Sequence, residues 1–202
     1  IEPYLTWDAE RFDCLNYVDA DKFQHGFDED CEAYLFVGRL SPEKGCDLFC
    51  EAASRAGVDA IVIGDGTELK RLSDSYPDIK FMGALSHDEV LSVMGRSRAI
   101  VIPSVCRETF GLVAYEAMIA AGLPCIVSDV GDAASFVRSK GLGEIFSAGS
   151  SESLSDAMVN MLDPDVCSRY RKAVEKADFS CLEKTAYVER LISIYDQLIA
   201  EH

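Results

Sequence analysis

The chain has 202 residues, of which 49% are hydrophobic, and its 35 acidic and 19 basic side chains give a formal net charge of −16. That length and apolar content suit one well-packed domain, and the sequence has no run of about 18 apolar residues that would span a membrane. The acidic excess argues against nucleic acid or an anionic membrane as the main partner of this segment.

The eight cysteines form no Cys-x-x-Cys pair and no cluster with histidine. Cys46 and Cys50 lie four residues apart on an expected helix, which is a spacing that would let them share a metal. Free cysteine buries readily, however, and we expect both on an apolar helix face. We therefore expect no metal site and a reducing, cytoplasmic environment.

The N-terminal part differs in pattern from the rest of the chain. Residues 1–32 have mixed polarity and weak periodicity, so we expect a linker or N-terminal extension there. From 33 to 202, short apolar runs alternate with helical patterns, which predicts one α/β domain that includes the C-terminal helices. The expected strands are 34–38, 60–64, 79–82, 99–102, 125–127 and 144–146. The expected helices are 47–56, 68–75, 86–95, 111–121, 132–139, 151–162, 164–178 and 181–200.

This alternation predicts a doubly wound, Rossmann-like six-stranded parallel sheet with helices on both faces. In the strand order 3-2-1-4-5-6, the first and fourth strands are neighbours at the switch point, where ligands bind beyond the carboxyl ends of the strands. The loops that follow these two strands also carry the most chemically distinctive sequence. We therefore expect the functional site between these two loops.

The stretch after the fourth strand places two carboxylates around a helix start. The helix is expected over 111–121, and Gly122 stands where a C-terminal cap belongs. Glu108 lies in the loop before this helix, and Glu116 lies about a turn and a half inside it. The free backbone N–H groups between them form an anion site. A ligand with a phosphate and several hydroxyls would suit this arrangement, because carboxylates accept hydrogen bonds from hydroxyls.

The run from Glu108 to Glu116, with Phe-Gly inside it and Gly-Leu-Pro after the helix, resembles the E-x7-E region of family 4 retaining glycosyltransferases. These enzymes have the GT-B fold and use a nucleotide-sugar donor. The resemblance implies that Glu108 is the catalytic carboxylate, which accepts from donor-sugar hydroxyls, and that Glu116 accepts from the ribose hydroxyls. It further implies donor contacts at Thr109, Phe110, Gly111 and Leu112.

A second motif occupies the loop after the first strand. Gly38-Arg39-x4-Lys44-Gly45 resembles the family's G-R-x4-K-G loop, in which the arginine and the lysine contact the donor diphosphate. The leaving nucleoside diphosphate gains negative charge as the sugar departs, and two fixed cations stabilise that charge where other folds use a divalent metal. The alternative is a pair of solvated loop cations. We favour the diphosphate role because basic residues are scarce and the Glu108 loop is the expected neighbour.

Two other loops each allow two interpretations. Residues 64–66, Gly-Asp-Gly, resemble the family's Gly-x-Gly turn, but we favour a tight strand-to-helix turn that needs glycine. The segment that contains Met82, Ala84 and Leu85 matches one that borders the nucleotide base in relatives. Simple packing at the end of a strand explains that segment equally well.

Residues 16–23 resemble the Asn-x-Val-Asp…Phe segment that joins the acceptor domain to the donor domain in this family. We therefore expect the acceptor domain to be missing from this chain. The chain departs from the family after the fifth strand, where relatives carry Gly-Gly-x-x-Glu and this sequence has Asp132 and Ser135 in place of the second Gly and the Glu. None of the three histidines is expected near the motifs: His25, His87 and His202.

The resemblance implies the donor-binding domain of a retaining glycosyltransferase, inactive without its acceptor domain. It would move a hexose, for example mannose or glucose, from a nucleoside-diphosphate sugar to a glycan, lipid or other acceptor. No metal or other cofactor is expected, and membrane contact is expected only through the absent domain. Two alternatives stay open: another GT-B enzyme such as a sugar-nucleotide epimerase, and a non-catalytic nucleotide- or sugar-binding module. The sequence does not identify the base, the sugar or the acceptor.

Overall fold

The computed structural model describes residues 16–18, 33–106 and 111–200. The chain divides into two units, one of residues 20–178 and one that joins residues 1–19 with 179–202. The expected division into an extension, 1–32, and a domain, 33–202, stays a prediction, because most of the extension lies outside the described residues.

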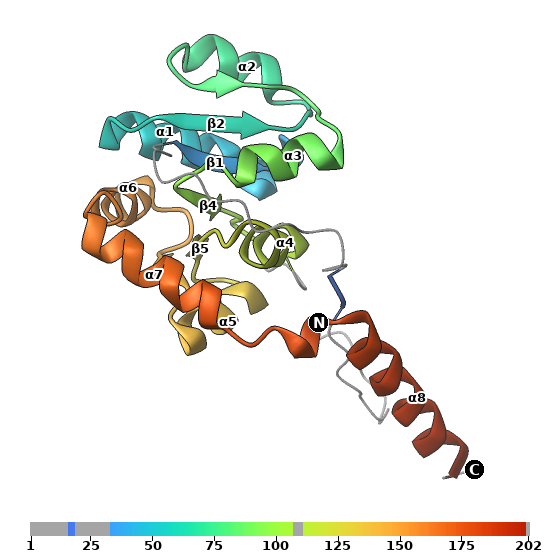
Figure 1. The fold of residues 1–202 in the computed structure, drawn as a ribbon. Helices are drawn as coiled ribbons and strands as arrows, with labels where there is room; N and C mark the ends of the chain where they lie inside the picture. Colours follow the sequence, from blue (N-terminus) through green and yellow to red (C-terminus); the bar gives the residue numbers. More distant parts are fainter. Residues whose placement is uncertain (1–15, 19–32, 107–110, 201–202) are drawn as a thin grey trace. The chain divides into compact units, whose positions relative to one another are not determined.

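The larger unit is built on one sheet of six parallel strands in the order β3-β2-β1-β4-β5-β6, which confirms the predicted doubly wound, Rossmann-like fold (Figure 1). Leu35 of β1 pairs with Ile61 of β2 on one side and Ile100 of β4 on the other. These strands are short apolar runs because both faces of a parallel sheet are covered. The strands are β1 Tyr34–Val37, β2 Ala60–Ile63, β3 Lys80–Phe81, β4 Ala99–Ile102, β5 Cys125–Ser128 and β6 Gly143–Phe146.

Helices cover both faces of the sheet. They are α1 Cys46–Ala56, α2 Leu69–Ser75, α3 His87–Met94, α4 Leu112–Ala121, α5 Asp132–Lys140, α6 Ser151–Asn160 and α7 Pro164–Lys176, with a 3₁₀ turn η3 at Pro42–Lys44. α1 packs against α6, and α3 packs against α4 (Figure 1). Neighbouring residues of β5 show that these pairs lie on opposite faces. The thiol of Cys125 contacts the carbonyl of Ala114 in α4 (3.7 Å), whereas Ile126 belongs to the core under α1 and α6.

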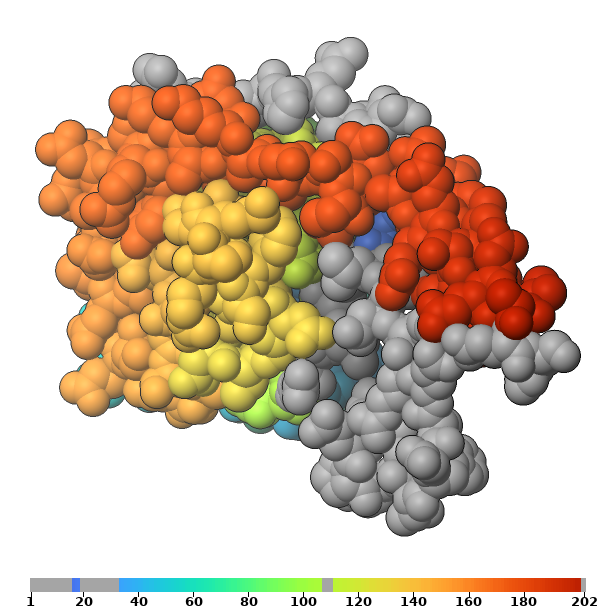
Figure 2. All heavy atoms as spheres, turned by 90° about the horizontal axis from the view of Figure 1, so that it is seen from below, coloured from blue at the N-terminus to red at the C-terminus, as the bar shows by residue number. Residues whose placement is uncertain are grey.

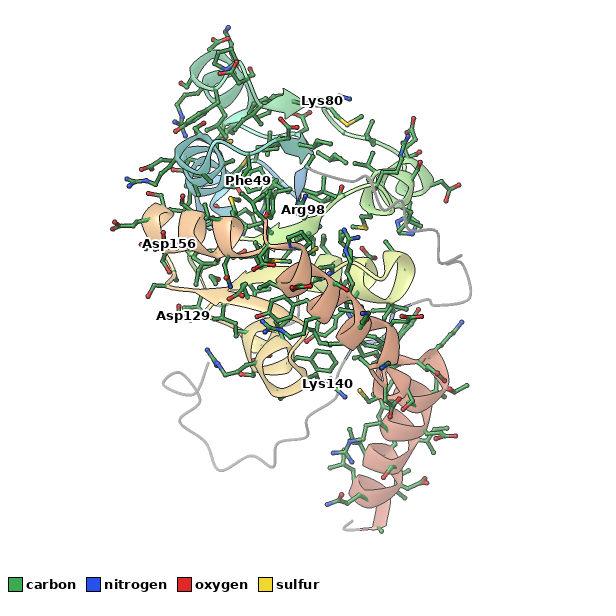
Figure 3. The ribbon with its side chains drawn as sticks, turned by 60° about the vertical axis from the view of Figure 1, so that its left-hand side comes forward. Phe49, Lys80, Arg98, Asp129, Lys140 and Asp156 are labelled. Carbon is green, nitrogen blue, oxygen red and sulfur yellow. The ribbon has the colours of Figure 1, made fainter. Side chains whose placement is uncertain are left out.

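The core between the sheet and the α1–α6 pair is aromatic. Phe49 of α1 is fully buried against the sheet (Figure 3), with its ring centroid 5.9 Å from that of Phe36 in β1. The buried hydroxyl of Tyr34 donates to the carbonyl of Met158 in α6 (2.6 Å), and its burial raises the pKa of Tyr34. Burying a large aromatic side chain stabilises the fold by roughly 1.5–3 kcal/mol. The sheet is therefore a firm platform for the loops at its edge.

Two further helices, α5 and α7, lie side by side on this unit (Figures 1 and 2). The ammonium group of Lys140, at the end of α5, donates to the carbonyl of Asp178, beyond the end of α7 (3.2 Å). A lysine is well placed at the C-terminal end of a helix because of the negative end of the helix dipole. This contact ties the segment after α7 back to the sheet layer.

Several helix ends follow signals present in the sequence. Gly122 adopts a left-handed conformation (φ 60°) at the end of α4, as a glycine cap does. Ser86 and Glu89 form the predicted capping box at the start of α3, where the Glu89 carboxylate accepts from the Ser86 amide (2.9 Å) and hydroxyl (2.6 Å). The start of α3 is thereby fixed in place.

The smaller unit holds a 3₁₀ turn, η4 Ser180–Leu182, and the long helix α8 Lys184–Ala200. The backbone N–H of Val18 donates to the carbonyl of Leu182 (2.9 Å), and the ring centroids of Tyr17 and Tyr187 lie 5.3 Å apart. Residues 17–18 therefore pack against residues 182–187 within this unit. Across the residues that the structure describes, α8 included, no helix has the length and apolar character needed to cross a membrane.

Candidate functional site

The loops after β1 and β2 lie against each other at the carboxyl edge of the sheet, toward which the arrowhead of β2 points in Figure 1. The Gly38 amide donates to the backbone carbonyl of Ile63 (3.0 Å), and the Leu40 amide donates to the backbone carbonyl of Asp65 (2.9 Å). A side chain at Gly64 would collide with the carbonyl of Gly38, and one at Gly66 would collide with that of Leu40. The favoured interpretation of residues 64–66 as a turn that needs glycine therefore agrees with the structure.

The loop after β1 is also locked to the loop after β4. Glu43 accepts on its carbonyl oxygen from the Val105 amide (3.1 Å) and from the thiol of Cys106 (3.8 Å). Gly45 adopts φ 68°, and a side chain there would collide with the carbonyl of Pro103. The two loops that carry the sequence motifs therefore meet at the switch point between β1 and β4.

Arg39 is held within its own loop. Its guanidinium lies 3.1 Å from the Glu43 carboxylate, and the side chains of the pair are 69% and 43% exposed. The Ser41 hydroxyl donates to the same carboxylate (2.7 Å), and this bond, with a smaller contribution from Arg39, holds the pKa of Glu43 below its usual value. Glu43 is a residue of this loop that the motifs did not predict, although its i,i+4 spacing from Arg39 was a visible signal. Lys44 is the last residue of η3 and is half-buried.

Only part of the motif from Glu108 to Glu116 falls within the described residues. Glu108, Thr109 and Phe110 lie outside the described residues. Gly111 precedes α4 with φ 68°, and Leu112 is the first helical residue, 39% exposed.

Glu116 lies within α4, where it is half-buried. Burial raises the pKa of Glu116, and the charge of His87 opposes that rise. A carboxyl group with such a raised pKa in the edge region of an α/β sheet is a candidate functional group.

The expectation that His87 lies away from the motifs is wrong. His87 is the first residue of α3, and because α3 packs against α4, its charge acts on the Glu116 carboxyl. No local sequence signal reveals this proximity, since the two residues are brought together by helix packing. His25 and His202 lie outside the described residues.

The loop after β3 joins the same edge. The Met82 amide donates to the backbone carbonyl of Val62 (2.9 Å), and the carbonyl of Gly83 accepts from the Gly64 amide (2.8 Å). Ala84 is exposed and Leu85 is half-buried, just before the capping box that starts α3. This segment therefore links the Gly64 turn to the helix that carries His87.

The ends of β4 and β5 enclose a small pocket. The Ser128 hydroxyl donates to the carbonyl of Ser104 (2.8 Å), and both residues are buried. Gly131 (φ 94°) precedes α5, and Asp132, which replaces a glycine of the family pattern, is its first residue. The pocket is lined by Ile102, Ser104, Val127, Ser128, Val130, Gly131, Asp132 and Ala133. Within residues 33–106 and 111–200, no three His, Cys, Asp or Glu side chains gather into a metal-binding group.

A Rossmann-like sheet with converging loops at its switch point defines the class: a doubly wound α/β domain. The sequence matches the family "Glycosyl transferases group 1" over residues 18–178, and the chain belongs to this family. It is 33% identical over 128 residues to a GDP-mannose-dependent alpha-mannosyltransferase of Mycobacterium tuberculosis, covering 63% of this chain and 33% of that protein. It is 31% identical over 160 residues to a phosphatidyl-myo-inositol mannosyltransferase of Mycobacterium leprae, covering 72% of this chain and 42% of that protein. The chain thus spans a third to two fifths of these relatives.

Solved structures agree with the fold. Sucrose-phosphate synthase from Thermosynechococcus elongatus superposes with a TM-score of 0.76 at 22% identity, covering 93% of this chain and 52% of that protein. HepE from Anabaena, solved in complex with UDP, gives a TM-score of 0.66 at 21% identity, covering 85% of this chain and 49% of that protein. The GT-B resemblance and the group 1 family are therefore confirmed, and the larger unit has the fold of one half of such proteins.

Proposed function

We propose that this chain is the donor-binding part of a retaining glycosyltransferase that takes a hexose from a nucleoside-diphosphate sugar. The observation that carries the proposal is the contact between the two motif loops, where Gly45 lies against Pro103 and Glu43 accepts from Val105. That contact holds the Arg39 loop beside the loop that leads to Glu108. A diphosphate and its sugar need groups from both loops.

The proposed roles are divided among the residues of the loops after β1, β3 and β4 and of helix α4. Arg39 and Lys44 hold the diphosphate, and Glu116 accepts from the ribose hydroxyls. The amides at the start of α4 support sugar and phosphate, as helix N-termini do for anions. Glu108 accepts from the sugar hydroxyls. Met82, Ala84 and Leu85 border the base. Their loop leads directly into α3, and α3 packs against α4, the helix that carries Glu116.

The proposed chemistry needs little more than positioning and charge. The bond between the anomeric carbon and the diphosphate oxygen breaks, the acceptor hydroxyl oxygen forms the new bond with the configuration retained, and the hydroxyl proton passes to the departing diphosphate. The departing diphosphate carries away the bonding electron pair, so it is stabilised by cations that are already in place. In the structure, Arg39 is paired with Glu43. The diphosphate would therefore either replace the Glu43 carboxylate as the partner of Arg39 or bind Arg39 alongside it.

The relatives suggest which donors to test first. Both relatives described above are named as mannosyltransferases, one of them as GDP-mannose-dependent, and a neighbour in fold was solved with UDP. We propose that residues beyond those in this chain supply the acceptor site, with 1–32 as the connection to the domain at 33–202. The acceptor would be a glycan, a lipid or another hydroxyl compound.

A non-catalytic nucleotide- or sugar-binding module remains the second candidate. Asp132 and Ser135 stand where the family has glycine and glutamate, and Asp132 lies at the pocket formed by the ends of β4 and β5. Such a module would bind the nucleotide but would release no product in the longer protein. Sugar transfer by that protein would exclude the non-catalytic module.

Thermal unfolding with added GDP, UDP and their hexose derivatives tests donor binding directly. A ligand at a hundredfold excess over its Kd stabilises the folded state by about 2.7 kcal/mol. We expect one diphosphate, with its sugar nucleotides, to raise the melting temperature. If none of these compounds shifts it at millimolar concentration, the donor-binding proposal fails.

A further inference from the structure

The carboxylate of Glu43 is held in place within the loop after β1. The Ser41 hydroxyl (2.7 Å) and the Arg39 guanidinium (3.1 Å) both donate to the same oxygen, Oε1. The main chain of Glu43 is fixed as well, because it lies in the 3₁₀ turn η3 and its carbonyl accepts from the Val105 amide of the neighbouring loop (3.1 Å). A turn of the Glu43 side chain away from Arg39 would also break the bond from Ser41.

Arg39 can bind a ligand without giving up Glu43. Within residues 33–106 and 111–200, its guanidinium donates to Glu43 through one nitrogen, Nη2, which leaves the N–H groups of Nε and Nη1 for a ligand. A guanidinium is a planar fork of donors that matches the geometry of phosphate. A diphosphate can therefore bind Arg39 while Glu43 keeps its place. The Glu43 carboxylate would then lie beside the bound phosphates as a fixed negative charge.

Glu43 is ionised at neutral pH. Its pKa lies below the usual value, chiefly because the Ser41 hydroxyl donates to the carboxylate. The loop thus holds two cations, Arg39 and Lys44, and one anion where the diphosphate is proposed to bind. Like charges repel with an energy that grows with the product of the charges. Glu43 therefore opposes an anionic ligand more strongly when that ligand carries more charge.

The donor and the nucleotide product of the proposed reaction differ in charge. In a nucleoside-diphosphate sugar, each of the two phosphates carries a single negative charge. The departing diphosphate takes up the acceptor proton on its terminal phosphate, which holds it with a pKa of about 6. At pH 8 the free diphosphate has lost that proton to solvent, so it carries one negative charge more than the donor. The Glu43 carboxylate therefore disfavours the product relative to the donor.

We propose that Glu43 is a specificity-determining residue of the donor site: its carboxylate, held beside Arg39, lowers the affinity for the free nucleoside diphosphate more than the affinity for the sugar nucleotide, and so favours product release. This inference rests on the proposed function and adds to it a residue that acts by repulsion. Discrimination between two similar ligands commonly uses a repulsive element besides the attractive ones. Arg39 and Lys44 attract both ligands, and Glu43 supplies the difference between them.

Calorimetric titration of the 202-residue chain at pH 8 tests the inference with two ligand pairs, GDP with GDP-mannose and UDP with UDP-glucose. The variant is Glu43→Gln, whose amide oxygen can still accept from Ser41 and Arg39, so that only the charge is removed. Asp74→Asn is the matched control. It removes one carboxylate from a similar exposed i,i+4 pair, with Lys70 on α2, and so changes the net charge equally.

We expect Glu43→Gln to tighten binding of the free diphosphate about two- to fivefold more than binding of the matching sugar nucleotide, which is the range that one pair of exposed charges contributes. Asp74→Asn should keep the wild-type ratio of the two affinities. If Glu43 only positions Arg39, the ratio in Glu43→Gln will equal that of the wild type, and this result would overturn the inference. An equal change of the ratio in Asp74→Asn would overturn it too, because net charge alone would then be the cause.

Glu43→Asp gives a second measurement, because it keeps the charge and shortens the side chain. We expect it to stay closer to the wild-type ratio than Glu43→Gln does. The same shift of the ratio in both variants would mean that side-chain geometry, and not charge, sets the preference, and the inference would fail. If the wild-type chain binds none of the four nucleotides, the proposed function itself falls. If it binds them and only the expected change of ratio is missing, this inference alone falls.

Discussion

Glu116 lies where burial disfavours its ionised form, so the position does not favour folding stability. It is the only charged side chain on a helix whose other residues are apolar and mostly buried, and burial raises its pKa. Ionisable groups disfavoured by burial persist where their chemistry is needed. The residue therefore connects the packing of α4 with the proposed ribose contact.

We predict that Glu116→Gln stabilises the fold while it weakens nucleotide binding. Because the folded-state pKa is raised, the carboxyl adds stability when it is protonated, and that contribution is lost as the pH rises through the folded-state value. At pH 8 the neutral amide should therefore raise the free energy of unfolding, and the gain should shrink as the pH is lowered toward 5. Chemical denaturation across this range measures it. A loss of stability at pH 8 would contradict the account.

Arg39 should matter for binding far more than for stability. An exposed ion pair contributes little to folding, whereas a hydrogen bond to a charged group contributes about 1.5–3 kcal/mol. Arg39→Gln should therefore weaken nucleoside diphosphate binding by about 10- to 150-fold with little change in melting temperature.

Lys70→Gln is the matched control for Arg39→Gln. Lys70 forms a similar exposed i,i+4 pair with Asp74, at 3.0 Å, on α2, and neither residue belongs to a motif loop. Calorimetry should show no change in affinity for Lys70→Gln. Equal losses from the two variants would mean that only the overall charge matters.

At the scale of elements, the site depends on glycines that let loops touch. The positive φ of Gly45 and its contact with Pro103 bring the β1 loop against the β4 loop, and Gly64 does the same between the β1 and β2 loops. A side chain at either position would push two loops apart. The geometry of the proposed donor site is therefore a property of loop packing as much as of its charged residues.

Gly45→Ala and Gly57→Ala separate backbone strain from loop contact. Both glycines have nearly the same left-handed conformation, φ 68° and φ 65°, but a side chain at Gly57 would meet no atom within 4 Å. Gly57→Ala should cost about 1–2 kcal/mol, the penalty of that conformation alone. Gly45→Ala should cost more and should also weaken GDP or UDP binding. Similar stability losses with unchanged binding in both would show that the loops need not be in contact.

Element order and several helix ends could be read from the sequence, because they depend on local patterns. Apolar runs and helical periods predicted the strands and helices, the Rossmann-like class to which they pointed supplied the sheet order, and Ser86 with Glu89 predicted the start of α3. The ends of the strands were predicted less closely, since β3 covers only Lys80–Phe81 of the strand expected at 79–82. The proximity of His87 to Glu116 could not be predicted, because it arises from the packing of two helices that are separated by a strand.

At the scale of the whole molecule, a chain with a net charge of −16 is proposed to bind a diphosphate. The long-range field of such a chain repels an anion and slows its approach, so the local cations and amides must supply the attraction. Arg39 and Lys44 come from one loop, and Glu43 partly neutralises that loop before the ligand arrives. The smaller unit, with α8, contributes none of the proposed donor-binding residues.

Calorimetric titration of the 202-residue chain with GDP and UDP in excess EDTA tests the central claim most directly, on wild type, Glu116→Ala and Glu108→Ala. We predict binding of one diphosphate per chain without metal, weakened about 10- to 150-fold by Glu116→Ala. It should be nearly unchanged by Glu108→Ala, whose proposed partner is the sugar. Binding that needs magnesium, equal losses from the two variants, or no loss from Glu116→Ala would contradict the account.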